Sequence, residues 1–139
     1  MTVENNAGQK RALVVDDDST MVEYVSAVLR RAGYQVETAG DGMTALEMYR
    51  ASVFDAVVCD IRMPKLPGTS FLKNLRLTTQ STCRVVLLSS MDDQNIRREV
   101  MEAGAAAYLV KPASSKAILE AVTGVTDRKS TRLNSSHRP

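Results

Sequence analysis

The stretch DAVVCDIRMPKLPG, residues 55–68, decides the fold of this chain of 139 residues. It opens with a short apolar run from Ala56 to Cys59, which favours a buried strand because it contains β-branched residues and is too short for a helix. Asp60 follows directly, and two prolines and a glycine then force the chain to turn. A lone acid between a buried strand and a stiff loop lies where open α/β sheets carry their chemistry.

The composition is that of an ordinary globular domain. Hydrophobic residues make up 44% of the chain and charged residues 24%, and this length supports one domain with its own core. The first residues, MTVENNAGQK, lack the apolar segment of a secretory signal. No apolar run approaches the roughly 20 residues of a membrane span. We therefore expect a cytoplasmic protein with no membrane association.

The two cysteines, Cys59 and Cys83, adjoin or lie in predicted strands. We expect both to be buried free thiols, as is usual in a reducing compartment. The single histidine, His137, lies in the C-terminal tail, so the sequence lacks the Cys/His spacing of a zinc site.

Most of the positive charge lies in the tail, DRKSTRLNSSHRP. Residues 127–139 carry a net charge of +3 and the whole chain +2, which leaves −1 for residues 1–126. Those residues lack the basic footprint of a nucleic-acid-binding domain, so we expect them to bind no nucleic acid. The polar, aperiodic composition predicts disorder over residues 126–139. Because DRKSTRLNSSH resembles the translation of a common sequencing adapter, we hypothesise that the tail is non-native, that the reading frame was lost near Thr126 and that a downstream domain is missing.

Around the central stretch, short strands alternate with amphipathic helices. The predicted strands are 12–15, 35–38, 56–59, 84–88 and 107–110, and the predicted helices are 21–32, 43–50, 70–77, 93–103 and 115–122. The expected N-caps include Asp18 or Ser19, Asp92, and Ser114 or Ser115. Strict alternation predicts an α/β fold, a doubly wound five-stranded parallel sheet with helices on both faces.

Polar residues follow four of the predicted strands: Asp16 and Asp17, Asp60, Ser89 and Lys111. Singly, each has an ordinary explanation as a helix cap or surface turn, but the carboxyl ends of parallel strands converge on one crevice. Three close carboxylates raise one another's pKa unless a cation compensates, and oxygen ligands suit Mg²⁺. A lysine and a serine opposite the acids would clamp a phosphoryl group, which makes Asp60 the natural nucleophile.

With these residues the chain resembles a response-regulator receiver domain, the phospho-acceptor half of two-component signalling. The resemblance rests on VVDDDST at 14–20, VVCDIRMPKLPG at 57–68, VVLLSS at 85–90 and AYLVKPA at 107–113. It covers residues 10–125, which we expect to form the receiver domain after a flexible start over residues 1–9. It implies a flavodoxin-like sheet with strand order 2-1-3-4-5 and five helices, an order for which a member of this family is itself a standard example.

The resemblance also implies roles at the acidic end of the site. Asp60 corresponds to the phosphorylated aspartate. Asp16 and Asp17 correspond to the acids that bind Mg²⁺ together with Asp60, and Arg62 would add its backbone carbonyl as a ligand.

A second group of residues resembles the clamp and the switch of the family. Lys111 corresponds to the clamp lysine, and its bond to Pro112 is typically cis. Ser89 corresponds to the switch hydroxyl that follows the phosphoryl group. Tyr108 corresponds to the aromatic residue whose rotamer reports the state of Ser89.

Three positions depart from the family pattern or vary within it. Ala113 replaces the commoner phenylalanine after Lys-Pro, which removes an apolar anchor at the start of the last helix. Arg62 and Met91 lie two residues beyond Asp60 and Ser89, at positions that tune the lifetime of the acyl phosphate in the family.

The function that follows from the resemblance is that of a phospho-acceptor. A histidine kinase or phosphotransfer protein would phosphorylate Asp60 with Mg²⁺, and this would switch a surface that binds an unidentified output protein or a second copy of the chain. The chain would catalyse phosphotransfer to and hydrolysis from its own Asp60, and would not be a turnover enzyme on an external substrate.

An enzymatic alternative comes from the same acidic run. Asp16, Asp18 and Thr20 fit the DxDxT signature of haloacid-dehalogenase-like phosphatases, with Asp16 as nucleophile. That family needs further acids after the lysine, where this chain has few, and it gives Asp60 no role.

Two alternatives keep the receiver fold. One is an inactive receiver that serves only as an interaction module, against which the full set of acids, hydroxyl and lysine argues. The other is a DNA-binding response regulator whose output domain was lost with the reading frame.

Overall fold

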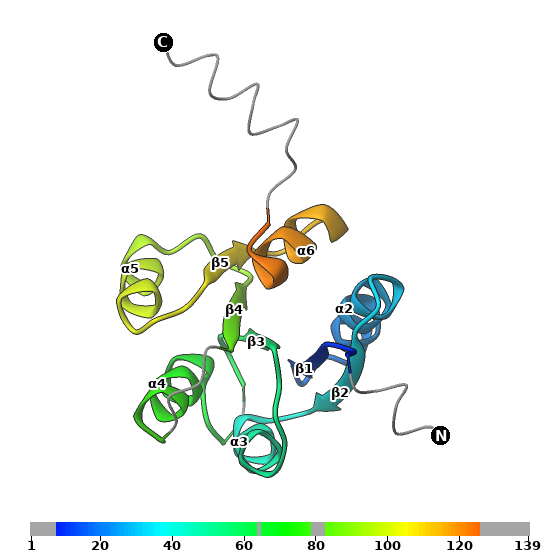
Figure 1. The fold of residues 1–139 in the computed structure, drawn as a ribbon. Helices are drawn as coiled ribbons and strands as arrows, with labels where there is room; N and C mark the ends of the chain where they lie inside the picture. The colour runs from blue at the N-terminus through cyan, green and yellow to red at the C-terminus, as the bar shows by residue number, and fades with distance from the viewer. Residues whose placement is uncertain (1–7, 64, 79–82, 126–139) are drawn as a thin grey trace.

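A five-stranded parallel sheet forms the centre of the computed structural model, which describes residues 8–63, 65–78 and 83–125 (Figure 1). The strands are β1 (Arg11–Val15), β2 (Gln35–Ala39), β3 (Ala56–Asp60), β4 (Arg84–Ser89) and β5 (Ala107–Val110). They lie in the order β2-β1-β3-β4-β5, and all four neighbouring pairs are parallel. The predicted flavodoxin-like order is therefore confirmed.

Five helices of the described residues cover the two faces of this sheet. They are α2 (Ser19–Arg31), α3 (Gly42–Ala51), α4 (Gly68–Thr78), α5 (Gln94–Glu102) and α6 (Ser115–Thr123). Figure 1 shows α2 and α6 on one face and α3, α4 and α5 on the other, which agrees with the residues that share each apolar cluster.

Each central strand supplies side chains to both clusters. In β1, Leu13 belongs to the cluster under α3, α4 and α5, whereas Val14 belongs to the cluster under α2 and α6. All five residues of β3 are buried. This two-sided burial is the reason that the strands have continuous apolar sequences.

Side-chain caps and glycines set the helix ends. Asp18 caps α2 and Ser114 caps α6, as expected. Gly33 follows the C-cap residue Ala32 of α2 and has a positive φ of 99°. The prediction that Asp92 caps α5 is wrong, because Asp93 has the extended backbone of an N-cap and its carboxylate accepts from the N–H groups of Asn95 and Ile96.

Both cysteines are buried free thiols, as predicted. Burial raises the pKa of Cys83 to about 11 and raises the pKa of Cys59 well above its ordinary value. The peptide bond between Lys111 and Pro112 is cis, in keeping with the family resemblance.

The predictions for the two ends of the chain lie outside the described residues, since these exclude 1–7 and 126–139. Within the described residues, no helix combines the length and the apolar character needed to cross a membrane.

The loop after β3 is held against the strand by a close backbone contact at Gly68. The Gly68 N–H donates to the carbonyl of Ile61 at 2.8 Å. A Cβ atom at Gly68 would lie 2.5 Å from the carbonyl oxygen of Asp60 and 3.0 Å from the Cα of Ile61. Only glycine therefore allows the loop to return this closely to Asp60.

We expect Gly68→Ala to lower the free energy of unfolding by about 1–3 kcal/mol, because the added methyl group must displace the backbone at Asp60. Urea denaturation measures this change. The matched control is Gly40→Ala, since nothing lies within 4 Å of a Cβ built there. Its stability should change by less than about 0.5 kcal/mol. Equal effects of the two substitutions would contradict the steric argument.

Candidate functional site

The carboxyl ends of the strands bring the predicted site residues to one edge of the sheet. Backbone hydrogen bonds extend the strand pairing to these positions: Asp16 N donates to Ala39 O at 3.1 Å, and Lys111 N donates to Ser89 O at 2.7 Å. Asp60 is the last residue of β3. The sheet itself thus fixes the backbone positions from which these side chains extend.

A cavity of about 300 Å³ joins these residues. Its lining consists of Asp16, Asp17, Asp18, Asp60, Ile61, Arg62, Ser89, Ser90 and Lys111. The predicted acids, lysine and serine therefore meet at one place, whereas the sequence had not singled out Ile61 or Ser90. Both are immediate neighbours of predicted residues, and no pattern in the sequence marks them as lining residues of a site.

Three carboxylates form the acidic side of the cavity. Oxygen atoms of Asp16, Asp17 and Asp60 all lie within 4.8 Å of one another. Asp16 and Asp60 are buried, and Asp17 is exposed. Burial raises the pKa of Asp16 and the nearby charge of Asp60 adds to this, while a hydrogen bond from the Asp18 N–H and the charge of Lys111 oppose it.

Lys111 connects two of these acids. Its Nζ lies 2.9 Å from Oδ1 of Asp60 and 3.4 Å from Oδ2 of Asp16. Burial alone would lower the pKa of Lys111, but the hydrogen bond and charge of Asp60 and the charge of Asp16 outweigh it, so the pKa is raised. Lys111 is therefore an ammonium group at neutral pH.

The donor set fits a hard divalent cation. The three carboxylates and Lys111 leave a net charge of −2, and every candidate ligand atom on the acids is an oxygen. Mg²⁺ prefers carboxylate oxygens and keeps several waters, for which an open cavity leaves room.

Ser89 and Tyr108 are linked through the loop after β4. Ser89 is buried, and its Oγ accepts from Met91 N at 3.1 Å. The Tyr108 hydroxyl donates to the carbonyl of the same Met91 at 2.7 Å. Tyr108 is only 4% exposed and is absent from the lining of the acidic cavity, so its contact with the site is indirect.

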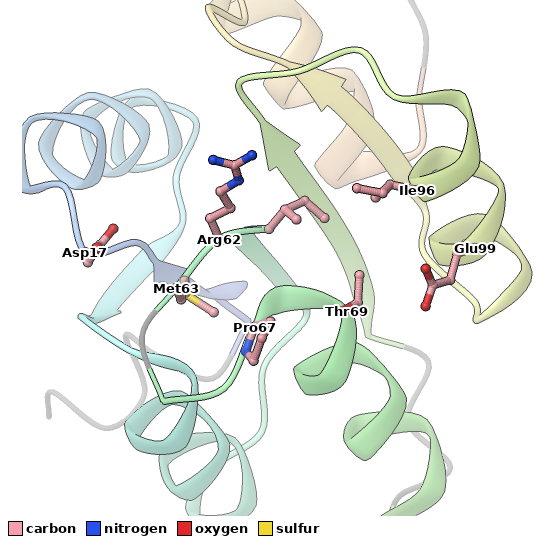
Figure 2. Close-up of a pocket in the computed structure, with 8 residues that line it drawn as sticks. Asp17, Arg62, Met63, Pro67, Thr69, Ile96 and Glu99 are labelled. Atoms are coloured by element: carbon pink, nitrogen blue, oxygen red, sulfur yellow. The ribbon is translucent and has the colours of Figure 1, made fainter.

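A second cavity of about 530 Å³ lies between the loop after β3 and α5 (Figure 2). It shares Asp17, Ile61 and Arg62 with the acidic cavity. Arg62 therefore borders both cavities, and its Nη2 contacts Sδ of Met91 at 3.3 Å. The contact connects the two loops that flank the site.

Tyr24 is a residue that the sequence analysis missed. Its hydroxyl, on α2, donates to the carbonyl of Ala113 at 2.8 Å and so holds the turn that follows Lys111. Ala113 is buried despite its small side chain. The predicted loss of an apolar anchor is thus accompanied by a polar anchor from α2. Helical spacing gave no signal for this contact, because Tyr24 lies outside the apolar positions of its helix.

We expect Asp16→Asn to raise the urea midpoint at pH 7 in the absence of divalent ions. A raised pKa means that ionising Asp16 is harder in the folded than in the unfolded protein, so the native protein loses stability as pH rises from about 4 through the folded pKa. Asparagine cannot ionise, and its side-chain oxygen can still accept from the Asp18 N–H.

The urea midpoint of Asp16→Asn should therefore no longer exceed that of the native chain at acidic pH, where the native carboxyl is protonated. Asp17→Asn is the matched control, because the exposed carboxylate of Asp17 is hydrated in both states and its removal should change the midpoint less. A lower midpoint for Asp16→Asn at pH 7 would show that the attraction between Asp16 and Lys111 outweighs the cost of burying the Asp16 carboxylate.

Comparison with known proteins places this arrangement in a family. The model of the response regulator receiver domain matches residues 12–123. The transcriptional regulatory protein ZraR of Klebsiella oxytoca is 39% identical over 100 residues, which are 72% of this chain and 22% of ZraR. The chemotaxis protein CheY of Treponema pallidum is 34% identical over 128 residues, with 86% of this chain and 88% of that protein covered.

A solved structure, the CheX–CheY–BeF3–Mg²⁺ complex from Borrelia burgdorferi, has a TM-score of 0.76 and 27% identity, and covers 83% of this chain and 87% of that chain. The chain thus spans most of a CheY but only 22% of ZraR. Because the family model covers well over half of its residues, the chain belongs to the response regulator receiver domain family of two-component signalling.

Proposed function

We propose that this chain accepts a phosphoryl group on Asp60 from a histidine kinase or phosphotransfer protein and then switches a protein-binding surface. The observation that carries the proposal is the position of the Asp60 carboxylate, 2.9 Å from Lys111 and inside the three-acid cluster. A nucleophile, a cation and a group of oxygen ligands in one open cavity are the parts that phosphoryl transfer needs.

Asp16, Asp17 and Asp60 would hold Mg²⁺ through their carboxylates, and Arg62 through its backbone carbonyl. When bound, the ion would neutralise charge on the incoming phosphoryl oxygens. Receiver domains bind Mg²⁺ at an acidic pocket, and the name of the B. burgdorferi complex includes both Mg²⁺ and BeF3. The cluster of acids found here supports the same assignment for this chain.

In the transfer, a carboxylate oxygen of Asp60 would attack phosphorus, the bond from phosphorus to the donor's histidine nitrogen would break, and the imidazole would leave with the bonding electrons. Lys111 would orient the phosphoryl oxygens. Hydrolysis by water would later regenerate Asp60. The chain would thus catalyse reactions of its own side chain, not turnover of an external substrate.

The signal would pass through Ser89 and Tyr108. A phosphoryl group on Asp60 would draw the Ser89 hydroxyl, which accepts from Met91 N in the structure. Tyr108 contacts the same loop through Met91 O. A shift of this loop would bias the surface formed by α5, β5 and α6 toward one of two states, to which an output protein or a second copy of the chain would bind.

A second candidate function is that of the receiver part of a DNA-binding transcriptional regulator in the cytoplasm. Its support is the relation to ZraR, of whose length the chain spans 22%. The uninterrupted reading frame at the source locus would test it, since an output domain encoded after residue 126 would favour this candidate.

The central test uses a small phosphodonor, acetyl phosphate, with Mg²⁺ and intact-protein mass spectrometry. The native chain should gain one phosphoryl group, and Asp60→Asn should gain none. Lys111→Ala should slow labelling by about 10²-fold, the cost of removing a group that stabilises transition-state charge. Chelation of Mg²⁺ should abolish labelling.

Asp18→Asn is the matched control, because Asp18 lines the same cavity but lies outside the three-acid cluster, and asparagine caps a helix equally well. It should label at the native rate. Labelling of Asp16 in the Asp60→Asn variant would instead favour the phosphatase alternative.

We expect the double variant Arg62→Asn, Met91→Ala to lose its phosphoryl group faster than the native chain. Arg62 lines the acidic cavity and contacts Met91, so a long cation backed by a bulky thioether lies beside the site, where the pair would hinder the attacking water. Decay of the phosphorylated protein after removal of the donor measures the rate. An equal or slower decay of the variant would refute the shielding.

A further inference from the structure

Arg97, on α5, packs over the ring of Tyr108. Its guanidinium carbon lies 4.7 Å from the centroid of the Tyr108 ring. Nη1 donates to the backbone carbonyl of Tyr108 at 3.4 Å, and Nη2 donates to Asp92 Oδ1 at 3.1 Å. One side chain therefore contacts the ring, the backbone of β5 and the loop that precedes α5.

The opposite end of Tyr108 is held by the same loop. Its hydroxyl donates to Met91 O at 2.7 Å and lies 3.5 Å from Asp93 N. An outward movement of the ring would break the hydroxyl contacts and separate the ring face from the guanidinium at the same time. The two sets of contacts therefore reinforce one buried position.

The ring contact and the carbonyl contact matter more than the ion pair. The side chains of Asp92 and Arg97 are 60% and 38% exposed, and exposed ion pairs are strongly screened by solvent. The Arg97 guanidinium lies over a ring that is only 4% exposed, so its attraction to the ring is less screened by solvent, and the guanidinium also shields the ring face from water.

We propose that Arg97 is a positioning residue that holds Tyr108 in its buried position and thereby increases the affinity of the Asp60 site for a phosphoryl group. The second half of this inference rests on the proposed function, since it requires Tyr108 and Asp60 to be coupled. The link consists of Met91, whose N–H contacts Ser89 and whose carbonyl accepts from Tyr108. In the proposed function, Ser89 moves toward the phosphoryl group and Tyr108 then lies inward, so a contact that stabilises the buried tyrosine would raise the population of the state that accepts the group.

The first measurement uses protein labelled with 3-fluorotyrosine and the solvent-isotope shift of each ¹⁹F resonance, which reports exposure to water. The chain has four tyrosines, and Tyr108→Phe identifies the resonance of Tyr108. Arg97→Gln should expose Tyr108, with the ratio of buried to exposed rings lowered by roughly three- to tenfold. Arg97→Lys should give an intermediate ratio, because it keeps the charge but loses the planar stacking.

The matched control is Arg98→Gln, a neighbouring arginine of α5 that lies on the exposed side of the helix. Arginine, lysine and glutamine have similar helix propensities, so all three variants should retain α5. An unchanged Tyr108 resonance in Arg97→Gln would overturn the proposal, and so would equal exposure in the glutamine and lysine variants, which would indicate packing alone.

The second measurement is the affinity for beryllofluoride, a phosphoryl mimic, in the presence of Mg²⁺. Arg97→Gln should bind it roughly three- to tenfold more weakly than the native chain. Equal affinity despite an exposed ring would overturn the coupling to Asp60. If the native chain binds no beryllofluoride, the proposed function fails, whereas the fluorine measurement still decides whether Arg97 positions Tyr108.

Discussion

The contact of Lys111 with Asp60 and Asp16 is the constraint on which the site depends. In the sheet order β2-β1-β3-β4-β5, Lys111 follows β5, yet its ammonium reaches across β4 to an acid of β3 and another after β1. Two buried carboxylates this close would repel each other strongly without it. The lysine thus permits an acidic cluster that still retains negative charge for a metal ion.

Much of this arrangement follows from the sequence by simple physics. Strands buried on both faces need continuous apolar residues, so the runs AVVC before Asp60 and VVLL before Ser89 could be recognised as strands from the sequence. Parallel strands place their carboxyl ends together, so the convergence of Asp60, Ser89 and Lys111 could be predicted before any distance was known. The order of the strands came only from the family resemblance.

Other contacts had no signal in the sequence. The Tyr24 hydroxyl donates to the carbonyl of Ala113, 89 positions away, and the Arg97 guanidinium lies over the ring of Tyr108. Such pairs depend on rotamers and on how two helices lie against the sheet edge, and helical periodicity specifies neither. The prediction of the N-cap of α5 was wrong by one residue, because two adjacent aspartates are chemically equal and only the backbone angles at Asp93 distinguish them.

The buried cysteines make the surface of the described domain inert to thiol reagents. Only the thiolate reacts quickly, and burial both shields Cys59 and Cys83 and disfavours their deprotonation. A cysteine engineered on α5 or α6 would then be the sole site of maleimide coupling, with both native cysteines left in place. Dyes or spin labels attached there would follow the motion of the surface formed by α5, β5 and α6 in the otherwise unaltered protein.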